Sequence, residues 1–130
     1  MTKEQKEKVK KLLSSYKTMK GQIECIDYEI SITKECIEGL KELRNTESYI
    51  IEKNNEIEYK LKVKKRLEDC INRTDKALNE LSNTEREIVE LRYLDGKKYT
   101  WKEISNIVEY SSDYCRKEML DRIFEKIYGI

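Results

Sequence analysis

With 130 residues, 38% of them hydrophobic and 41% charged, the chain is too polar for a large compact core, but its composition is ordinary for long amphipathic helices. It lacks proline and has a net charge of +1. No apolar run approaches the ~20 residues of a membrane span, and the N-terminus is polar where a signal peptide has its apolar core, so we expect an all-α cytoplasmic protein. With no histidine, only four glycines and no Cys-x-x-Cys pair, we expect neither an enzyme nor a metal or cofactor site.

Apolar side chains recur at alternating intervals of three and four residues through the first 44 residues. They are Val9, Leu12, Tyr16, Met19, Ile23, Ile26, Ile30, Thr33, Ile37 and Leu40. This pattern is a heptad repeat that begins with Val9 at position a and Leu12 at position d. It predicts a continuous helix of about 40 residues, whose apolar seam must be covered by another helix.

The heptad pattern stops at residues 44–48, where Asn45 and Thr46 are candidate helix caps. A second helix is predicted from about Tyr49 to Leu81, with sparser apolar residues at Ile50, Ile57, Leu61, Leu67, Ile71, Leu78 and Leu81. The short connection favours an antiparallel hairpin, whereas the β-branched a positions also allow a parallel homodimer through the N-terminal heptads. In either arrangement residues 1–81 form a coiled-coil-like stalk.

Positive charge is concentrated in the second half of this stalk, at Lys60, Lys62, Lys64, Lys65 and Arg66. The default interpretation of such a run is a solvated helix face. The alternative is that Lys60, Lys64, Lys65 and Arg66 contact the backbone of a nucleic acid.

The last 49 residues carry two sets of helix caps, and they predict a separate domain over residues 82–130. Ser82 with Glu85 forms one capping-box pattern, and the helix that it begins is expected to run to Leu94, before Asp95-Gly96. Thr100 with Glu103 forms the second capping box. The following helix places Trp101, Ile104 and Val108 on one apolar stripe, with Lys102, Glu103 and Asn106 elsewhere.

Residues 109–111 break this register, with Tyr110 expected to fill an apolar gap and Ser111 or Ser112 to cap the next helix. The inward residues of that helix are expected to be Cys115, Met119, Ile123 and Ile127. Two short helices joined by a tight turn are typical of a helix-turn-helix. The residues expected to contact DNA are Lys102, Ser112, Asp113, Tyr114, Arg116 and Lys117, with Lys97 and Lys98 as further backbone contacts.

One further pattern covers most of the C-terminal residues: Leu81-Ser82-Asn83-Thr84-Glu85-Arg86-Glu87-Ile88-Val89-Glu90-Leu91-Arg92-Tyr93, Asp95-Gly96, Thr100, Glu103-Ile104 and Ser111. With these residues the segment resembles region four of bacterial sigma factors and the phage late-transcription regulators of the ArpU/RinA type. Glycine is common in that family where Glu109 stands, since the position needs a left-handed backbone. The resemblance implies a phage or prophage transcription regulator that binds promoter DNA, with RNA polymerase as a further partner.

Charge complicates this interpretation, because residues 84–130 contain nine Lys/Arg and ten Asp/Glu, a net charge of −1. Affinity for DNA depends mainly on neutralising phosphates, so this segment alone should bind weakly. Two other functions stay open: a phage small terminase subunit that marks DNA for packaging, and a coiled-coil adaptor that binds only protein. Trp101 is expected to be a core anchor, Tyr114 is either core or base contact, and the four cysteines are expected to be buried.

Overall fold

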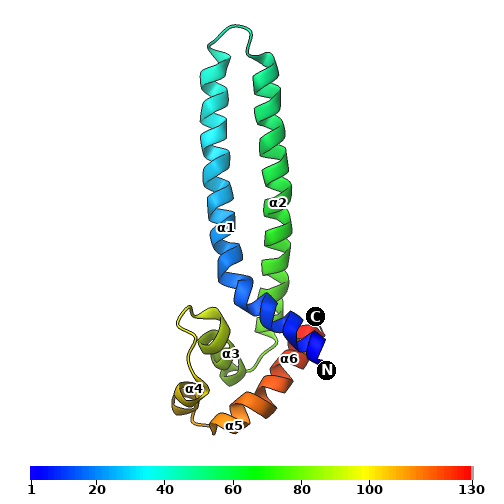
Figure 1. Cartoon of the computed structure of the whole chain (residues 1–130), viewed down its shortest axis with the longest axis vertical. Helices are drawn as coiled ribbons and strands as arrows, with labels where there is room; N and C mark the ends of the chain where they lie inside the picture. The colour runs from blue at the N-terminus through cyan, green and yellow to red at the C-terminus, as the bar shows by residue number, and fades with distance from the viewer. Residues whose placement is uncertain (130) are drawn as a thin grey trace. The chain divides into compact units, whose positions relative to one another are not determined.

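The computed structural model describes residues 1–129, and this part of the chain consists of helices and short connections without a β-strand (Figure 1). Two long helices come first, α1 (Lys3–Lys41) and α2 (Glu47–Asn79). The prediction of an all-α protein with a long N-terminal helical segment is therefore confirmed. Within the described residues, none of the helices combines the length and apolar character needed to cross a bilayer.

Shorter helices follow from residue 83 onward. α3 (Asn83–Val89) continues directly into a π-helical turn, η1 (Glu90–Leu94), and a loop leads to α4 (Trp101–Val108). The last three elements are continuous along the chain: α5 (Ser112–Tyr114), the π-helical turn η2 (Cys115–Met119) and α6 (Leu120–Tyr128).

The contacts divide the chain into two compact units. The hairpin unit is Met19–Cys70, and the terminal unit combines Met1–Thr18 with Ile71–Ile130. Helix α1 therefore contributes its first turns to one unit and its remaining turns to the other. The domain boundary after Leu81 stays a prediction, while the contacts group the N-terminal residues with the C-terminal helices.

In the hairpin unit, α1 and α2 run antiparallel and side by side (Figure 1). Ile30, Ile37 and Ile57 are buried between them, with Ile26 and Ile50 packed alongside. Two ion pairs join the helices: Lys60 Nζ lies 3.2 Å from Glu29 Oε2, and Lys64 Nζ lies 2.6 Å from Asp27 Oδ1. Of the two arrangements that the sequence leaves open, this one covers the heptad seam within a single chain.

The heptad prediction for α1 is confirmed, because all ten of its residues are buried or half-buried. The prediction for α2 is wrong at Leu61, which is 48% exposed. The seam positions of α2 recur every seven residues, at Ile50, Ile57, Lys64 and Ile71. Between Ile57 and Lys64 the seam position is occupied by Lys60, and its neighbour Leu61 is left outside the seam. A lysine can occupy such a position because its methylenes cover apolar surface while its ammonium group reaches an acidic partner.

The connection between α1 and α2 is short, and it is held by one buried threonine. Thr46 Oγ1 donates a hydrogen bond to the Leu40 carbonyl oxygen (2.7 Å), and the Thr46 carbonyl accepts from the Ile50 N–H. Asn45, just before it, has a φ of 59°, a left-handed conformation that asparagine tolerates better than most residues. Thr46 therefore stands at the start of α2, at one of the two predicted cap positions.

The terminal unit has the larger core, with several side chains that are almost completely inaccessible. They are Leu13, Thr74, Ile88, Val89, Ile104, Cys115, Ile123 and Phe124. Leu13 comes from α1 and lies outside the predicted heptad seam, because here α1 packs against the short helices as well as α2. The four predicted inward residues of the last helix are all buried, as predicted.

Leu120 and Phe124 are also buried, although the prediction took only every fourth residue from Cys115. The π-helical turn η2 precedes them, and the Leu120 N–H donates to the Cys115 carbonyl, five residues earlier. A π-turn contains an extra residue, so it rotates the helix that follows relative to an ideal α-helix. After η2, the residues Leu120, Ile123, Phe124 and Ile127 form the i, i+3, i+4, i+7 face of the regular helix α6, and this face is buried in the core.

The predicted capping box at the start of α3 is confirmed, and it is joined to α6 by an ion pair. Ser82 Oγ accepts from the Glu85 N–H (3.2 Å), and Glu85 Oε1 accepts from the Ser82 N–H (2.9 Å). The same Oε1 lies 2.6 Å from Lys126 Nζ, and Glu85 is buried. Burial opposes ionisation of Glu85, but the hydrogen bonds from Lys126 and Ser82 outweigh it and lower the pKa of this carboxyl.

Candidate nucleic-acid interface

The first helix of the predicted DNA-binding motif, α4, begins at a reciprocal cap. Thr100 Oγ1 accepts from the Glu103 N–H (3.2 Å), while Glu103 Oε1 accepts from the Thr100 N–H (3.1 Å). Thr100 Oγ1 also donates to Glu103 Oε1 (2.9 Å), and the two hydrogen bonds that Thr100 donates, from its N–H and its hydroxyl, lower the pKa of Glu103 because they stabilise its ionised form. Trp101 follows as a half-buried side chain of the core, as predicted, and the Arg92 guanidinium lies 4.9 Å from its ring.

The three residues between α4 and α5 form a tight turn. Glu109 has φ 63° and ψ 28°, the left-handed conformation predicted at this position, and its N–H donates to the Ser105 carbonyl (3.0 Å). Ser105 Oγ donates to the Tyr110 carbonyl (2.6 Å), and Ser111 Oγ caps the next helix by accepting from the Tyr114 N–H (3.2 Å). The prediction that Tyr110 fills an apolar gap is wrong, because its side chain is 47% exposed.

The outward side of the helical segment that begins at Ser112 is accessible within the terminal unit. Asp113, Arg116 and Lys117 are exposed, and Ser112 is half-buried. Arg116 Nη2 lies 3.0 Å from Asp113 Oδ1, one helical turn earlier. Asp113 therefore orients the Arg116 guanidinium at the surface, and it also partly neutralises the charge that an anion would meet.

Tyr114 lies among protein groups. It is half-buried, its ring centroid is 5.5 Å from that of Tyr110, and its hydroxyl accepts from Arg122 Nη2 (3.1 Å). The Arg122 guanidinium also lies 5.8 Å from the Tyr114 ring. Of the two roles that the sequence allows, these contacts favour packing over contact with a base.

The remaining candidate contacts fall in two places. Lys97, Lys98 and Lys102 are exposed, around the loop before α4 and in its first turn. In the hairpin unit, Lys65 and Arg66 are exposed on α2, whereas the ion pairs described above hold Lys60 and Lys64. The basic run is therefore divided between a helix seam and an open face.

The terminal unit contains a source of positive charge that the sequence interpretation assigned to the stalk. Met1–Thr18 carries six lysines and two glutamates, and it packs with the C-terminal helices. As a whole the terminal unit has 17 Lys/Arg and 14 Asp/Glu, a net charge of +3, compared with −1 for residues 84–130. The density of lysines in the first 18 residues is the signal that could have identified this contribution.

Cysteine burial differs from the prediction. Cys115 is buried, and burial raises the pKa of its thiol, but Cys25 and Cys36 are exposed and Cys70 is half-buried. Among residues 1–129, no cluster of three or more histidine, cysteine or acidic side chains is arranged to hold a metal ion.

Comparison with known proteins adds no relative: no family model, no curated protein and no solved structure matches the chain.

Proposed function

We propose that the protein is a DNA-binding transcription regulator and that the helical segment beginning at Ser112 enters the major groove. One observation carries the proposal. Arg116 and Lys117 are exposed near the start of a helical segment that follows α4 after a three-residue, left-handed turn. A basic surface near the start of the second helix is what a helix-turn-helix uses to reach base edges and phosphates.

Each side chain has a distinct role in this proposal. Arg116 reads a guanine through two hydrogen bonds once its guanidinium leaves Asp113, and Lys117 contacts a phosphate. Lys102, Lys97 and Lys98 contact the DNA backbone beside the groove, and Ser112 faces the duplex at the start of the segment. The packed Tyr114 supports the position of the helix through Tyr110 and Arg122.

Charge supports the proposal better than the C-terminal sequence alone suggested. Met1–Thr18 brings its six lysines into the unit that holds the proposed DNA-reading helix. Neutralising backbone phosphates supplies most of the non-specific affinity of a DNA-binding protein. We therefore infer that these lysines contribute to the affinity, while Arg116 and Lys117 contribute to the choice of sequence.

The sequence resemblance to sigma region four and to ArpU/RinA-type regulators gives the proposal its biological setting. In that setting the protein is encoded by a phage or prophage, binds promoter DNA and contacts bacterial RNA polymerase. The hairpin unit then acts as a partner-binding or spacing element.

Selection from a random duplex library, followed by fluorescence anisotropy with the selected duplex, tests the proposal. The Arg116→Ala, Lys117→Ala double variant should bind at least tenfold more weakly, since a bidentate contact to a base is worth ~1–3 kcal/mol. The matched control is Arg73→Ala with Lys76→Ala, an exposed Arg/Lys pair on α2 in the same unit. Equal affinity of the two double variants would contradict the assignment of the reading helix.

A second substitution acts in the opposite direction. Asp113→Asn removes the negative charge beside Arg116 and should strengthen binding to unselected DNA. A variant that was merely less stable would bind more weakly, so the sign of the change distinguishes electrostatics from damage to the fold.

One observation favours a second candidate, an adaptor that binds only protein. The hairpin unit exposes seven large apolar side chains: Tyr28, Ile32, Leu43, Tyr49, Ile51, Tyr59 and Leu61. Exposed apolar surface is a feature of protein-binding sites. Salt-insensitive binding to RNA polymerase, combined with no measurable affinity for any duplex, would select this candidate instead.

A further inference from the structure

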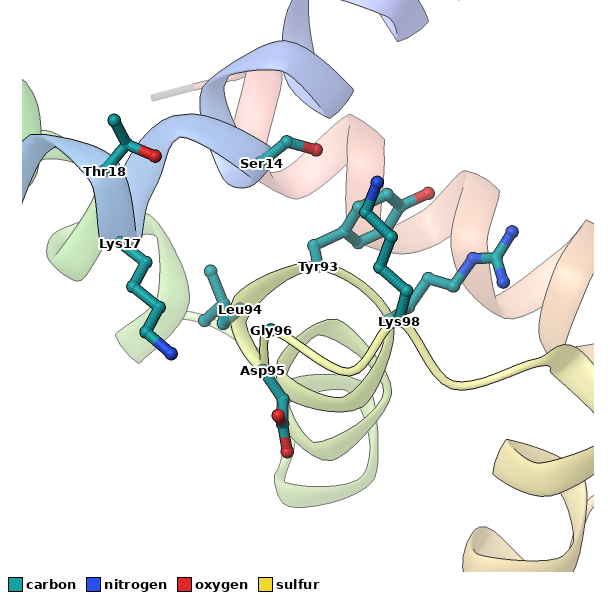
Figure 2. Close-up of a pocket in the computed structure, with 9 residues that line it drawn as sticks. Ser14, Lys17, Thr18, Tyr93, Leu94, Asp95, Gly96 and Lys98 are labelled. Atoms are coloured by element: carbon teal, nitrogen blue, oxygen red, sulfur yellow. The ribbon is translucent and has the colours of Figure 1, made fainter.

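The terminal unit contains an open pocket of about 440 Å³ where α1, η1 and the loop before α4 meet. Figure 2 shows Lys17, on α1, on one side of Leu94 and Gly96, and Lys98, from the loop, on the other. The complete lining is Ser14, Lys17, Thr18, Arg92, Tyr93, Leu94, Asp95, Gly96 and Lys98. The pocket is thus formed by segments that are far apart in the sequence.

Its lining is strongly cationic. Lys17, Arg92 and Lys98 carry positive charge, and Asp95 is the single acidic residue among the nine. The Asp95 carboxylate is partly occupied, because its Oδ1 accepts from the Lys97 N–H (3.3 Å). Hydroxyl groups from Ser14, Thr18 and Tyr93 add neutral hydrogen-bond donors to the same lining.

The two lysines come from backbones of different kinds. Lys17 lies within the regular helix α1, whereas Lys98 has a φ of 49°, a left-handed conformation that is strained for a residue with a β-carbon. Gly96 lies next to Lys17, since a β-carbon added there would be in ordinary van der Waals contact with Lys17 Nζ at 3.5 Å. Arg92 is fixed separately, because its Nη1 donates to the Tyr99 carbonyl (2.9 Å) and its guanidinium lies over Trp101.

We propose that this pocket binds a phosphate group. A phosphate monoester carries about −1.5 to −2 charges and three acceptor oxygens, so it can use two lysines and the hydroxyl donors of the lining together. A ligand with a single carboxylate has less charge and fewer acceptor oxygens for the same donors. Lys17 and Lys98 supply the charge, Ser14 and Thr18 donate hydrogen bonds, and Arg92 adds to the positive field. The phosphate comes either from a phosphorylated small molecule or from the backbone of DNA, and the inference does not rest on the proposed regulator function.

Amide chemical-shift mapping with inorganic phosphate tests the pocket directly. Titration of the full chain should give saturable shifts at residues 14–18 and 92–98, and sodium chloride at the same ionic strength should not. The Lys17→Gln, Lys98→Gln double variant should bind phosphate at least tenfold more weakly. The control, Lys3→Gln with Lys97→Gln, removes the same charge from α1 and from the same loop without touching the lining.

The Asp95→Asn substitution protects the test against simple loss of structure. It removes the negative charge from the lining while keeping an oxygen that can accept from the Lys97 N–H, so phosphate should bind several-fold more tightly. Weaker binding by Asp95→Asn would count against the proposal.

A parallel titration with the selected duplex identifies the source of the phosphate. Pocket shifts with DNA that persist in the Arg116→Ala, Lys117→Ala variant indicate a backbone phosphodiester, and shifts with inorganic phosphate alone indicate a free phosphorylated ligand. Lys98 belongs to both proposals, but the Arg116→Ala, Lys117→Ala variant leaves both pocket lysines intact and inorganic phosphate needs no reading helix, so failure of one proposal is distinguishable from failure of the other. Absence of saturable shifts with both ligands, or equal binding by the lysine double variant, would overturn the phosphate assignment.

Discussion

The two units of this protein bury apolar residues in different ways. In the terminal unit several side chains, among them Leu13, Ile104 and Phe124, have at most 1% of their surface exposed. In the hairpin unit the cluster of Ile30, Ile37 and Ile57 retains 6–9% exposure, and lysines occupy seam positions of α2. A two-helix hairpin cannot surround a side chain, so its stability comes from a row of partial contacts and ion pairs.

This difference matters for function. A reading helix must hold its side chains in a fixed orientation, and the packed core beneath η2 and α6 provides that support. The hairpin unit instead presents exposed apolar groups and a separate set of charges, with net −2 against +3 for the terminal unit. Under our proposal the terminal unit recognises DNA, and the hairpin unit contacts protein.

The largest expected effect is the loss of a core side chain in the terminal unit. Phe124→Ala should lower the free energy of unfolding by about 3–5 kcal/mol, because the ring is almost fully enclosed and leaves a cavity. Ile57→Ala in the hairpin unit should cost about 2 kcal/mol, since neighbouring side chains can relax toward the open site. Urea unfolding followed by circular dichroism checks both values, and equal losses would contradict the contrast in packing.

The next effect concerns the Glu85–Lys126 pair of the terminal unit. Because the pKa of Glu85 is lowered in the folded state, the pair stabilises the fold at pH values above 4.5, the ordinary pKa of glutamate. This stabilisation is lost as the pH falls through the pKa of Glu85 in the folded state. Glu85→Gln should therefore cost about 1–2 kcal/mol at pH 7, a value reduced from that of a fully buried pair because Lys126 is half exposed. The difference between variant and wild type should shrink at pH 3, and a constant difference would count against the ion pair.

A stabilising substitution is expected at the turn before the proposed reading helix. Glu109→Gly should raise the free energy of unfolding by about 1 kcal/mol, since glycine adopts the left-handed conformation without a steric cost. Asn45→Gly, at the left-handed position of the hairpin connection, should give a smaller gain because asparagine already tolerates that conformation. Thermal unfolding of the two variants measures the difference, and a loss of stability in Glu109→Gly would contradict it.

The smallest effect is expected from the ion pairs of the hairpin unit. Lys60→Gln should change the free energy of unfolding by about 0.5 kcal/mol or less, and 1 M salt should remove the change.

The second ion pair of the hairpin unit predicts a pH dependence. The hydrogen bond to Asp27 raises the pKa of Lys64, and desolvation opposes this with a smaller effect. The Lys64–Asp27 pair therefore contributes fully to stability at pH values below 10.5, the ordinary pKa of lysine. This contribution is lost only as the pH rises through the pKa of Lys64 in the folded state. A pH dependence of the Lys64→Gln effect between pH 5 and 8 would contradict this assignment.

Local signals in the sequence were sufficient for much of the fold. The two capping boxes, the left-handed position at Glu109 and the heptad seam of α1 follow from interactions over three or four residues, and all are found. Of the residues proposed to contact DNA, Arg116 and Lys117 are neighbours in one helical segment, and both are exposed as that proposal requires.

Features that depend on tertiary contacts were not predictable in the same way. The π-helical turn η2 itself carries no periodic mark, whereas Phe124 could have been found, because Leu120, Ile123, Phe124 and Ile127 follow the i, i+3, i+4, i+7 pattern of an amphipathic helix. Leu13 and the lysines of Met1–Thr18 join the terminal unit because α1 packs there against helices more than 60 residues away in sequence. The exposure of Leu61 follows from Lys60 taking the seam position, which depends on its acidic partner on α1.

The most direct test of the central claim is amide chemical-shift mapping of the full chain with the duplex selected from a random library. If the terminal unit reads DNA, the largest shifts should occur at residues 111–117 and should be lost in the Arg116→Ala, Lys117→Ala variant. Shifts confined to residues 47–70 of α2, and unchanged in that variant, would show that the reading helix has been assigned to the wrong region.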